Sequence, residues 1–198
     1  MTNTADTGTA QIPMARVETP GRTEHVWSLP VDEPFLEAFL RDLFETHYHE
    51  LTFGPIVPGA AYELRVPGPA RSVTMMDGYL TVHWGTGGHF HLCIGTNYGS
   101  KSNPNPPEVI AQRRPGRAEL YRSLDKEGHP NSWGFRMFNG AGEQQITIFF
   151  PNPFITSDDQ LADEADFSRL AVWDHVLATY AGYEPDPLDR MSKGFRLG

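Results

Sequence analysis

Residues 79–95 read YLTVHWGTGGHFHLCIG, which is two strand-like runs on either side of a glycine-rich turn. This pattern predicts a β-hairpin that turns at Thr86–Gly87. Alternate side chains of a strand lie on one face, so His89, His91 and Cys93 would form a row. Imidazole and thiolate groups are ligands for zinc and iron. The stretch therefore predicts an antiparallel fold and a candidate metal site.

Pairing across this hairpin decides which side chains surround the row. With the turn at residues 86–87, the expected pairs are Trp84 with His89, Val82 with His91, and Leu80 with Cys93. Cross-strand partners share a face. Trp84 would therefore lie beside the row, and we include it among the candidate substrate-binding residues.

The number of ligands limits which residues can share an ion. Catalytic sites commonly use three protein ligands and keep one position open. Residues four apart in a strand are separated by about 13 Å, so His89 and Cys93 would not share an ion. His89 with His91, or His91 with Cys93, would need a further ligand from elsewhere. His129 is the freest candidate because it lies in a predicted turn; the others are His47, His49, Glu50 and His83.

Other interpretations of the row stay open. Without a metal, His89 or His91 could act as a general acid or base, since imidazole titrates near neutral pH. A cysteine such as Cys93 is often a small buried core residue. A histidine on an apolar sheet face can also ligate haem, which would be non-covalent because the chain has no attachment motif.

Arginines cluster between residues 113 and 122 in a chain whose net charge is -9. The guanidinium fork fits a carboxylate or a phosphate. Arg113, Arg117 and Arg136 are therefore candidate anchors for an anionic substrate, and Arg136 and His129 are the candidate catalytic residues. The alternative is a solvated face on which the arginines pair with neighbouring acids.

The remaining sequence predicts a single α+β domain, with an antiparallel sheet of about five to seven strands built from hairpins. A second hairpin is expected over 132–150, turning at Asn139–Gly140. Helices over 33–48 and 158–181 would flank the sheet, and residues 107–128 read as a helix broken at Pro115. The helix over 33–48 would bury one face, formed by Leu36, Phe39, Leu40, Leu43 and Phe44.

The expected organisation is an N-terminal arm over 1–24, the domain over 25–183 and a C-terminal tail over 184–198. The arm has no signal-peptide pattern and no apolar run approaches a membrane span, so we expect a cytoplasmic protein. The acidic charge argues against nucleic-acid and membrane-surface partners. The single cysteine excludes an internal disulfide. The tail could reach across a partner subunit in a homodimer.

Together these features favour a metal-dependent enzyme that acts on a small, anionic organic molecule. Divalent zinc or iron held by His89 and His91, with Cys93 or His129 completing or supporting the site, would polarise the substrate or activate water or oxygen. Hydrolysis, elimination and oxidation stay open. One alternative is a non-catalytic haem-binding, metal-binding or sensing protein, and another is a metal-free structural or interaction domain.

Overall fold

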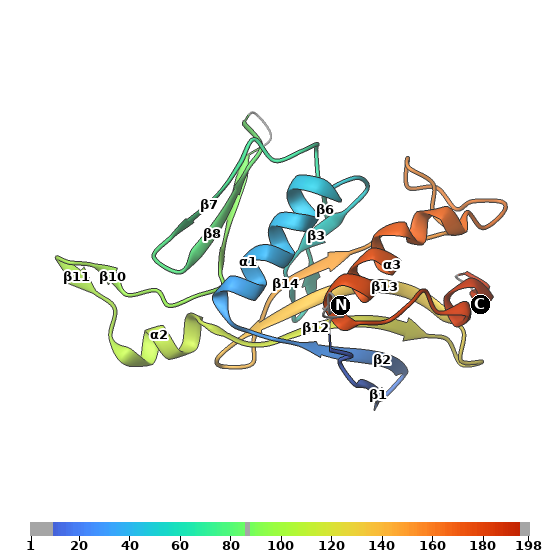
Figure 1. Cartoon of the computed structure of the whole chain (residues 1–198), viewed down its shortest axis with the longest axis horizontal. Helices are drawn as coiled ribbons and strands as arrows, with labels where there is room; N and C mark the ends of the chain where they lie inside the picture. The colour runs from blue at the N-terminus through green and yellow to red at the C-terminus, as the bar shows by residue number, and fades with distance from the viewer. Residues whose placement is uncertain (1–9, 86–87, 195–198) are drawn as a thin grey trace, which may run out of the picture.

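A seven-stranded antiparallel sheet forms the centre of the molecule (Figure 1). The computed structural model describes residues 10–85 and 88–194. The strand order is β1-β2-β12-β13-β14-β3-β6. The bounds are β1 Met14–Thr19, β2 Arg22–Leu29, β12 Pro115–Leu124, β13 Pro130–Asn139, β14 Gln144–Phe149, β3 Thr52–Gly54 and β6 Leu64–Arg65.

A second sheet contains the hairpin at residues 79–95. It consists of β7 Ser72–Met76, β8 Tyr79–His83 and β9 His89–Cys93. It lies beside α1, Glu33–Arg41 (Figure 1). Phe44, in the helical turn that follows α1, contacts Phe90 of β9 with ring centroids 5.3 Å apart. Two short hairpins are formed by β4 Ile56–Val57 with β5 Ala60–Ala61, and by β10 Gly99–Ser100 with β11 Asn103–Pro104.

Helices α1 and α3 cover one face of the main sheet (Figure 1). Helix α1 continues into a π-helical turn, η1 Asp42–Thr46. The C-terminal helix has three parts: the 3-10 turn η3 Phe167–Leu170, α3 Ala171–Val176 and the π-helical turn η4 Leu177–Ala181. The other helical segments are α2 Pro107–Arg113 and the 3-10 turn η5 Pro187–Met191. Among the described residues, no helix has the length and apolar character needed to cross a membrane.

The hydrophobic core lies between these helices and the sheet. One row of buried side chains crosses five neighbouring strands: Trp27, Leu120, Phe135, Ile148 and Phe53. The helix side supplies the five residues predicted from the 33–48 pattern, each fully buried. The predicted class is confirmed: the protein is a single α+β domain built mostly on antiparallel sheet.

The prediction of a broken helix over 107–128 is wrong beyond α2. Residues 115–124 form β12, which lies between β2 and β13. Ala118 and Leu120 face the helices, whereas Glu119 and Tyr121 face the opposite side, and all four are buried. Residues 117–120 alternate between polar and apolar side chains, which is a strand pattern, but the helical interpretation took the arginines and acids of this segment as a solvated helix face.

The last helix begins at Phe167, so the prediction of a start near Asp158 is also wrong. The Thr156 side chain accepts the Gln160 amide N–H and donates to Asp158, and these bonds hold residues 156–160 in a turn. Local side-chain bonds of this kind compete with helix formation. Asp166 caps the helix instead by accepting the Ser168 amide N–H.

Much of the predicted arm and tail belongs to the folded domain. Strand β1 and the start of β2 lie within residues 1–24. In the tail, η5 buries Asp189, which accepts bonds from Trp133 Nε1 at 2.7 Å and Trp173 Nε1 at 2.8 Å. The same carboxylate lies 3.0 Å from an Arg122 nitrogen, so this part of the tail packs on its own chain. The predicted turn at Thr86–Gly87, residues 1–9 and residues 195–198 lie outside the described part.

His25 should make the stability of this region depend on pH. Arg122 Nε donates to His25 Nδ1 at 3.0 Å. Burial, and then the charge of Arg122, lowers the pKa of His25 below its usual 6.5. Below about pH 6.5, His25 is therefore protonated more readily in the unfolded chain than in the folded chain. The free energy of unfolding falls as the pH drops.

We expect the contribution of His25 to the free energy of unfolding to fall between about pH 7.5 and about pH 5.5, by at most about 1.4 kcal/mol per pH unit. Urea unfolding at the two pH values measures the effect. His25→Gln should flatten the dependence, because a glutamine oxygen can accept the same bond without titrating. An equal slope in wild type and variant would contradict this assignment.

Candidate metal centre

The register of the β8–β9 hairpin differs by one residue from the predicted pairing. Tyr79 lies opposite Cys93, Thr81 opposite His91 and His83 opposite His89. The predicted pairs, which placed Trp84 opposite His89, are therefore wrong. The observed register buries one face of the hairpin, and burial of a whole face decides between registers that differ by one residue. The buried face consists of Leu80, Val82, Leu92 and the partly buried Phe90.

The predicted ligand row supplies two exposed imidazoles and no thiolate. His89 and His91 are exposed, with ring centroids 5.0 Å apart. Cys93 is buried, and its Sγ donates to the Gly95 carbonyl oxygen at 3.6 Å. Burial raises the pKa of the Cys93 thiol, which is consistent with a protonated thiol that donates this bond.

His83 does not complete the row as the side chains lie. Its Nδ1 accepts the Gly85 amide N–H at 2.9 Å, which leaves the proton of the neutral ring on Nε2. His91 Nδ1 lies 2.7 Å from Thr81 Oγ1 and can donate to it, which leaves Nε2 free for a metal. In the described part of the hairpin, the exposed ligands in this row are therefore the two imidazoles of His89 and His91.

His129 and Trp84 lie in other environments. His129 is in the β12–β13 turn, 3.6 Å from carboxylate oxygens of Asp125 and Glu127. Trp84 packs against the core aromatic residues Phe44, Phe53 and Phe90. The structure therefore does not bring His129 to the histidine row, and it gives Trp84 a packing role.

The three candidate arginines are each occupied by the protein itself. Arg113 donates to Asn97 Oδ1 at 2.7 Å. Arg117 pairs with Glu119 at 2.7 Å and lies 3.8 Å from the centre of the Phe138 ring. These contacts give Arg113 and Arg117 partners within the protein, and their role as substrate anchors stays a prediction.

Arg136 lies at the centre of a charged network on the sheet face opposite the helices. Its guanidinium donates to Glu24 at 2.9 Å and to Glu119 at 2.8 Å, and both carboxylates are buried. Burial alone would lower the pKa of Arg136, but the bonds to the two glutamates raise it overall. Arg22 and Arg117 pair with the outer sides of the same carboxylates. Arg136 therefore holds the sheet together and is not free for a substrate.

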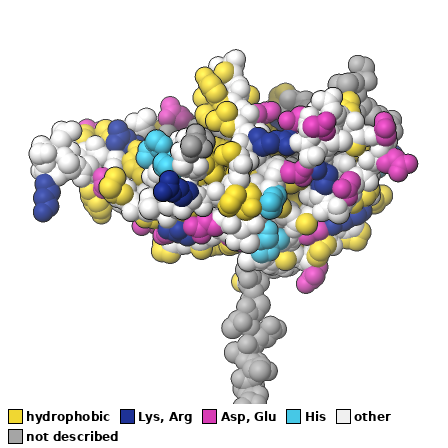
Figure 2. All heavy atoms as spheres, turned by 90° about the horizontal axis from the view of Figure 1, so that it is seen from above, with side chains coloured by type: hydrophobic (Ala, Val, Ile, Leu, Met, Phe, Trp, Pro, Cys, Tyr) yellow, Lys and Arg dark blue, Asp and Glu magenta, His cyan; other side chains and the backbone are white. Residues whose placement is uncertain are grey.

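A different set of ligands lies where the two long helical segments meet. His175 Nε2 is 2.6 Å from Asp42 Oδ2, and His47 Nε2 is 3.6 Å from Asp42 Oδ1. The two imidazole rings lie 4.0 Å apart. One ligand atom from each residue lies within 4.8 Å of the others. Each side chain is partly exposed, so the cluster is open to solvent. Figure 2 shows histidine side chains gathered at two places on this face of the molecule.

Two π-helical turns adjoin the cluster. Asp42 opens η1, and the His47 amide N–H bonds to the Asp42 carbonyl five residues earlier. Tyr180, in η4, is likewise five residues after His175, and its hydroxyl donates to Asp42 Oδ2 at 3.0 Å. Single π-helical turns are rare and are frequently found at functional sites.

The surroundings of the cluster favour neutral imidazoles next to the Asp42 carboxylate. Burial, and then the neighbouring His175, lowers the pKa of His47, which favours the neutral ring that a metal needs. Burial and the bond to Asp42 raise the pKa of Tyr180, so this hydroxyl stays protonated and donating.

Sequence reasoning named His47 only among the residues that could complete a ligand set with the β9 row, and it did not name His175. The interval of five between Asp42 and His47 does not match the i, i+3 and i, i+4 contacts of an α-helix. Residues at that interval come into contact only where the helix has a π-helical turn. A search for acid and histidine pairs five residues apart would have singled out Asp42 with His47.

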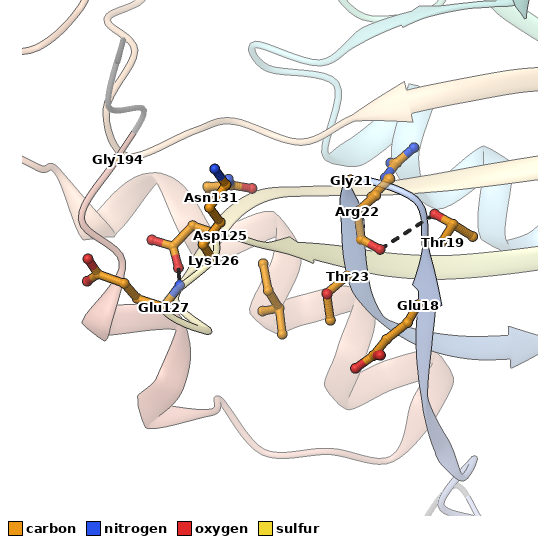
Figure 3. A pocket seen from close by; sticks show the side chains of 11 residues that line it. Glu18, Thr19, Gly21, Arg22, Thr23, Asp125, Lys126, Glu127, Asn131 and Gly194 are labelled. Atoms are coloured by element: carbon orange, nitrogen blue, oxygen red, sulfur yellow. Dashed lines mark hydrogen bonds between the residues drawn. The ribbon is translucent and has the colours of Figure 1, made fainter.

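A pocket of about 710 Å³ lies elsewhere, between the β1–β2 and β12–β13 turns. Figure 3 shows Asp125 and Glu127 on one side and Glu18 and Arg22 on the other. Arg22 is bonded to Glu24, and Asp125 accepts the Glu127 amide N–H. None of the metal candidates lines this pocket, and we assign no ligand to it.

The geometry defines an α+β protein with two histidines and an aspartate gathered between two helices. The family of unknown function DUF7676 matches residues 13–182, so the chain belongs to this family. The comparisons with curated proteins and with solved structures found no match.

Proposed function

We propose that this protein is a metal-dependent enzyme whose divalent ion, zinc or iron, is held by Asp42, His47 and His175. The observation that carries the proposal is the convergence of two imidazoles and one carboxylate within ligand-sharing distance. Two histidines and one carboxylate with open positions are typical of non-haem iron sites and of catalytic zinc sites.

The Asp42–His175 contact supports a metal here in a specific way. At 2.6 Å, Nε2 and Oδ2 must share a proton. An ion would replace this proton and take both atoms as ligands, while Thr179 Oγ1, 3.4 Å from His175 Nδ1, would orient the ring. Tyr180 would keep its bond to the carboxylate and hold it in place.

The charge of the site supports an anionic substrate. A divalent ion with one carboxylate and two neutral imidazoles carries a net charge of about +1, which favours a carboxylate or phosphate as the exogenous ligand. When bound, the ion would polarise such a substrate or activate water. The arginines predicted as anchors are not needed for this role, because the ion itself supplies the charge.

The test is elemental analysis and zinc titration of tag-free protein purified without chelators. We expect close to one ion per chain, and we expect His47→Ala and His175→Ala each to weaken zinc binding by more than about 100-fold, since loss of outer-shell partners alone costs 10–100-fold. His49→Ala is the matched control and should bind normally. Circular dichroism would confirm that each variant is folded.

Two outcomes would overturn the assignment. If His89→Ala or His91→Ala removes the ion while the His47 and His175 variants retain it, the metal belongs to the β9 row. If the protein takes up no ion at all, the metal proposal fails. A visible spectrum with a Soret band would indicate haem instead. Metal-dependent turnover of small carboxylate or phosphate esters, lost in His175→Ala, would distinguish an enzyme from a metal-binding sensor.

A further inference from the structure

Strand β1 leaves one long edge of the main sheet open. Its six residues, Met14–Thr19, are all exposed, and within the described part of the chain β1 pairs only with β2. The opposite edge strand, β6, has only two residues. An exposed edge carries a row of unpaired N–H and C=O groups that can pair with another strand.

The sequence of β1 lacks two of the features that block edge pairing, namely proline and a bulge. Charged side chains also protect edges, but the two in β1, Arg16 and Glu18, have opposite signs. The strand reads MARVET, with no proline, and its six pairs with β2 run without a register shift. The first proline beyond it, Pro20, lies in the turn to β2. This edge is therefore a regular template for a further strand.

The charges of β1 make it complementary to itself. Arg16 and Glu18 flank Val17 and lie on one face of the strand, where Arg16 Nε donates to Glu18 Oε1 at 3.0 Å. We propose that two copies of the chain pair through β1 about a two-fold axis, with Val17 opposite the partner's Val17. Arg16 then lies opposite the partner's Glu18, and Glu18 opposite the partner's Arg16.

Electrostatics selects this register among its neighbours. A two-fold axis between antiparallel strands requires one residue to lie opposite its own copy, so the closest alternatives centre on Arg16 or on Glu18. The first places Arg16 opposite the partner's Arg16, and the second places Glu18 opposite the partner's Glu18. Like charges directly opposite each other destabilise a strand pair, whereas opposite charges stabilise it. The result is an isologous dimer with one sheet continuous across both copies.

Sedimentation velocity over a range of concentrations tests this interface. We expect wild type to show a reversible monomer–dimer equilibrium, with the small buried area giving weak association. Arg16→Glu and Glu18→Arg should each weaken dimerisation by more than about tenfold, because each creates two like-charge pairs. The double variant Arg16→Glu/Glu18→Arg should restore it, because the charges are exchanged and remain complementary.

Further variants separate this interface from general charge effects. Val17→Lys places two ammonium groups at the two-fold axis and should abolish the dimer. Lys101→Glu, in the exposed β10–β11 hairpin, should leave it unchanged. A wild type that stays monomeric at all concentrations would overturn the proposal. So would a dimer that single charge reversals do not weaken, or one that the double reversal does not restore. Circular dichroism would verify that each variant keeps the fold.

Discussion

Asp189→Ala is expected to lower the free energy of unfolding by about 3–5 kcal/mol, the cost of removing one partner from a buried ion pair. Asp189 is fully buried, accepts bonds from the indole N–H groups of Trp133 and Trp173, and forms an ion pair with Arg122. Without the carboxylate, the Arg122 guanidinium, whose side chain is 3% exposed, loses its buried counter-ion. Both tryptophans also lose their acceptor. Chemical denaturation of the full chain measures the loss.

Asp186→Ala is the matched control for this prediction. Asp186 also pairs with Arg122, but its side chain is 38% exposed. Its replacement should cost about 1 kcal/mol, mainly through loss of the cap on Leu188. The loss of stability for Asp189→Asn should lie between the losses for Asp189→Ala and Asp186→Ala, because an amide oxygen can still accept a bond from one indole. Equal small losses for Asp189→Ala and Asp186→Ala would show that the tail does not anchor the core.

Arg136→Met should cost about 3 kcal/mol, near the lower end for breaking a buried ionic network. Two buried carboxylates, Glu24 and Glu119, share this guanidinium. After the change each keeps only one arginine partner, Arg22 or Arg117, and both of these are about half exposed. Denaturant unfolding would show the loss of stability.

Neutralising the two acids should rescue this variant. Arg136→Met with Glu24→Gln and Glu119→Gln removes the buried charges and should recover more than half of the lost stability. Arg117→Met, at the exposed end of the network, should change stability by less than about 1 kcal/mol. If Arg136→Met keeps full stability, the guanidinium is not structural and its predicted role in binding a substrate would return.

The elements of the fold that bury only one face were predictable from the sequence. The apolar face of α1 and the hairpin at Asn139–Gly140 follow from local rules, and both are present. The same rules apply to the Asp77–Gly78 turn, which joins β7 to β8. Asp77 and Gly78 both have positive φ, as the hairpin turn requires. Strand β12 was missed because its arginines and acids were interpreted as the solvated face of a helix, whereas Glu119 and Arg122 are buried in the sheet.

The candidate site was less predictable for a different reason. The row His89, His91 and Cys93 was correctly placed on one strand, but only tertiary packing decides that Cys93 is buried while the histidines face solvent. The cluster of Asp42, His47 and His175 joins residues 133 positions apart. A single sequence carries no signal for the contact between Asp42 and His175. The contact between Asp42 and His47 is local, but its five-residue interval is not one that an α-helix brings together.

The two π-helical turns have a consequence for how this family can vary. An α-helix rotates by about 100° per residue, and a π-helical turn holds one residue more than that winding allows. Deleting one residue from η1 would restore α-helical winding and swing His47 away from Asp42. A deletion in η4 would do the same to Tyr180. The deletion in η1 would break up the cluster of Asp42, His47 and His175, whereas the deletion in η4 would remove the bond by which Tyr180 holds Asp42. The five-residue interval between Asp42 and His47 is therefore as necessary to the site as the identity of the two residues.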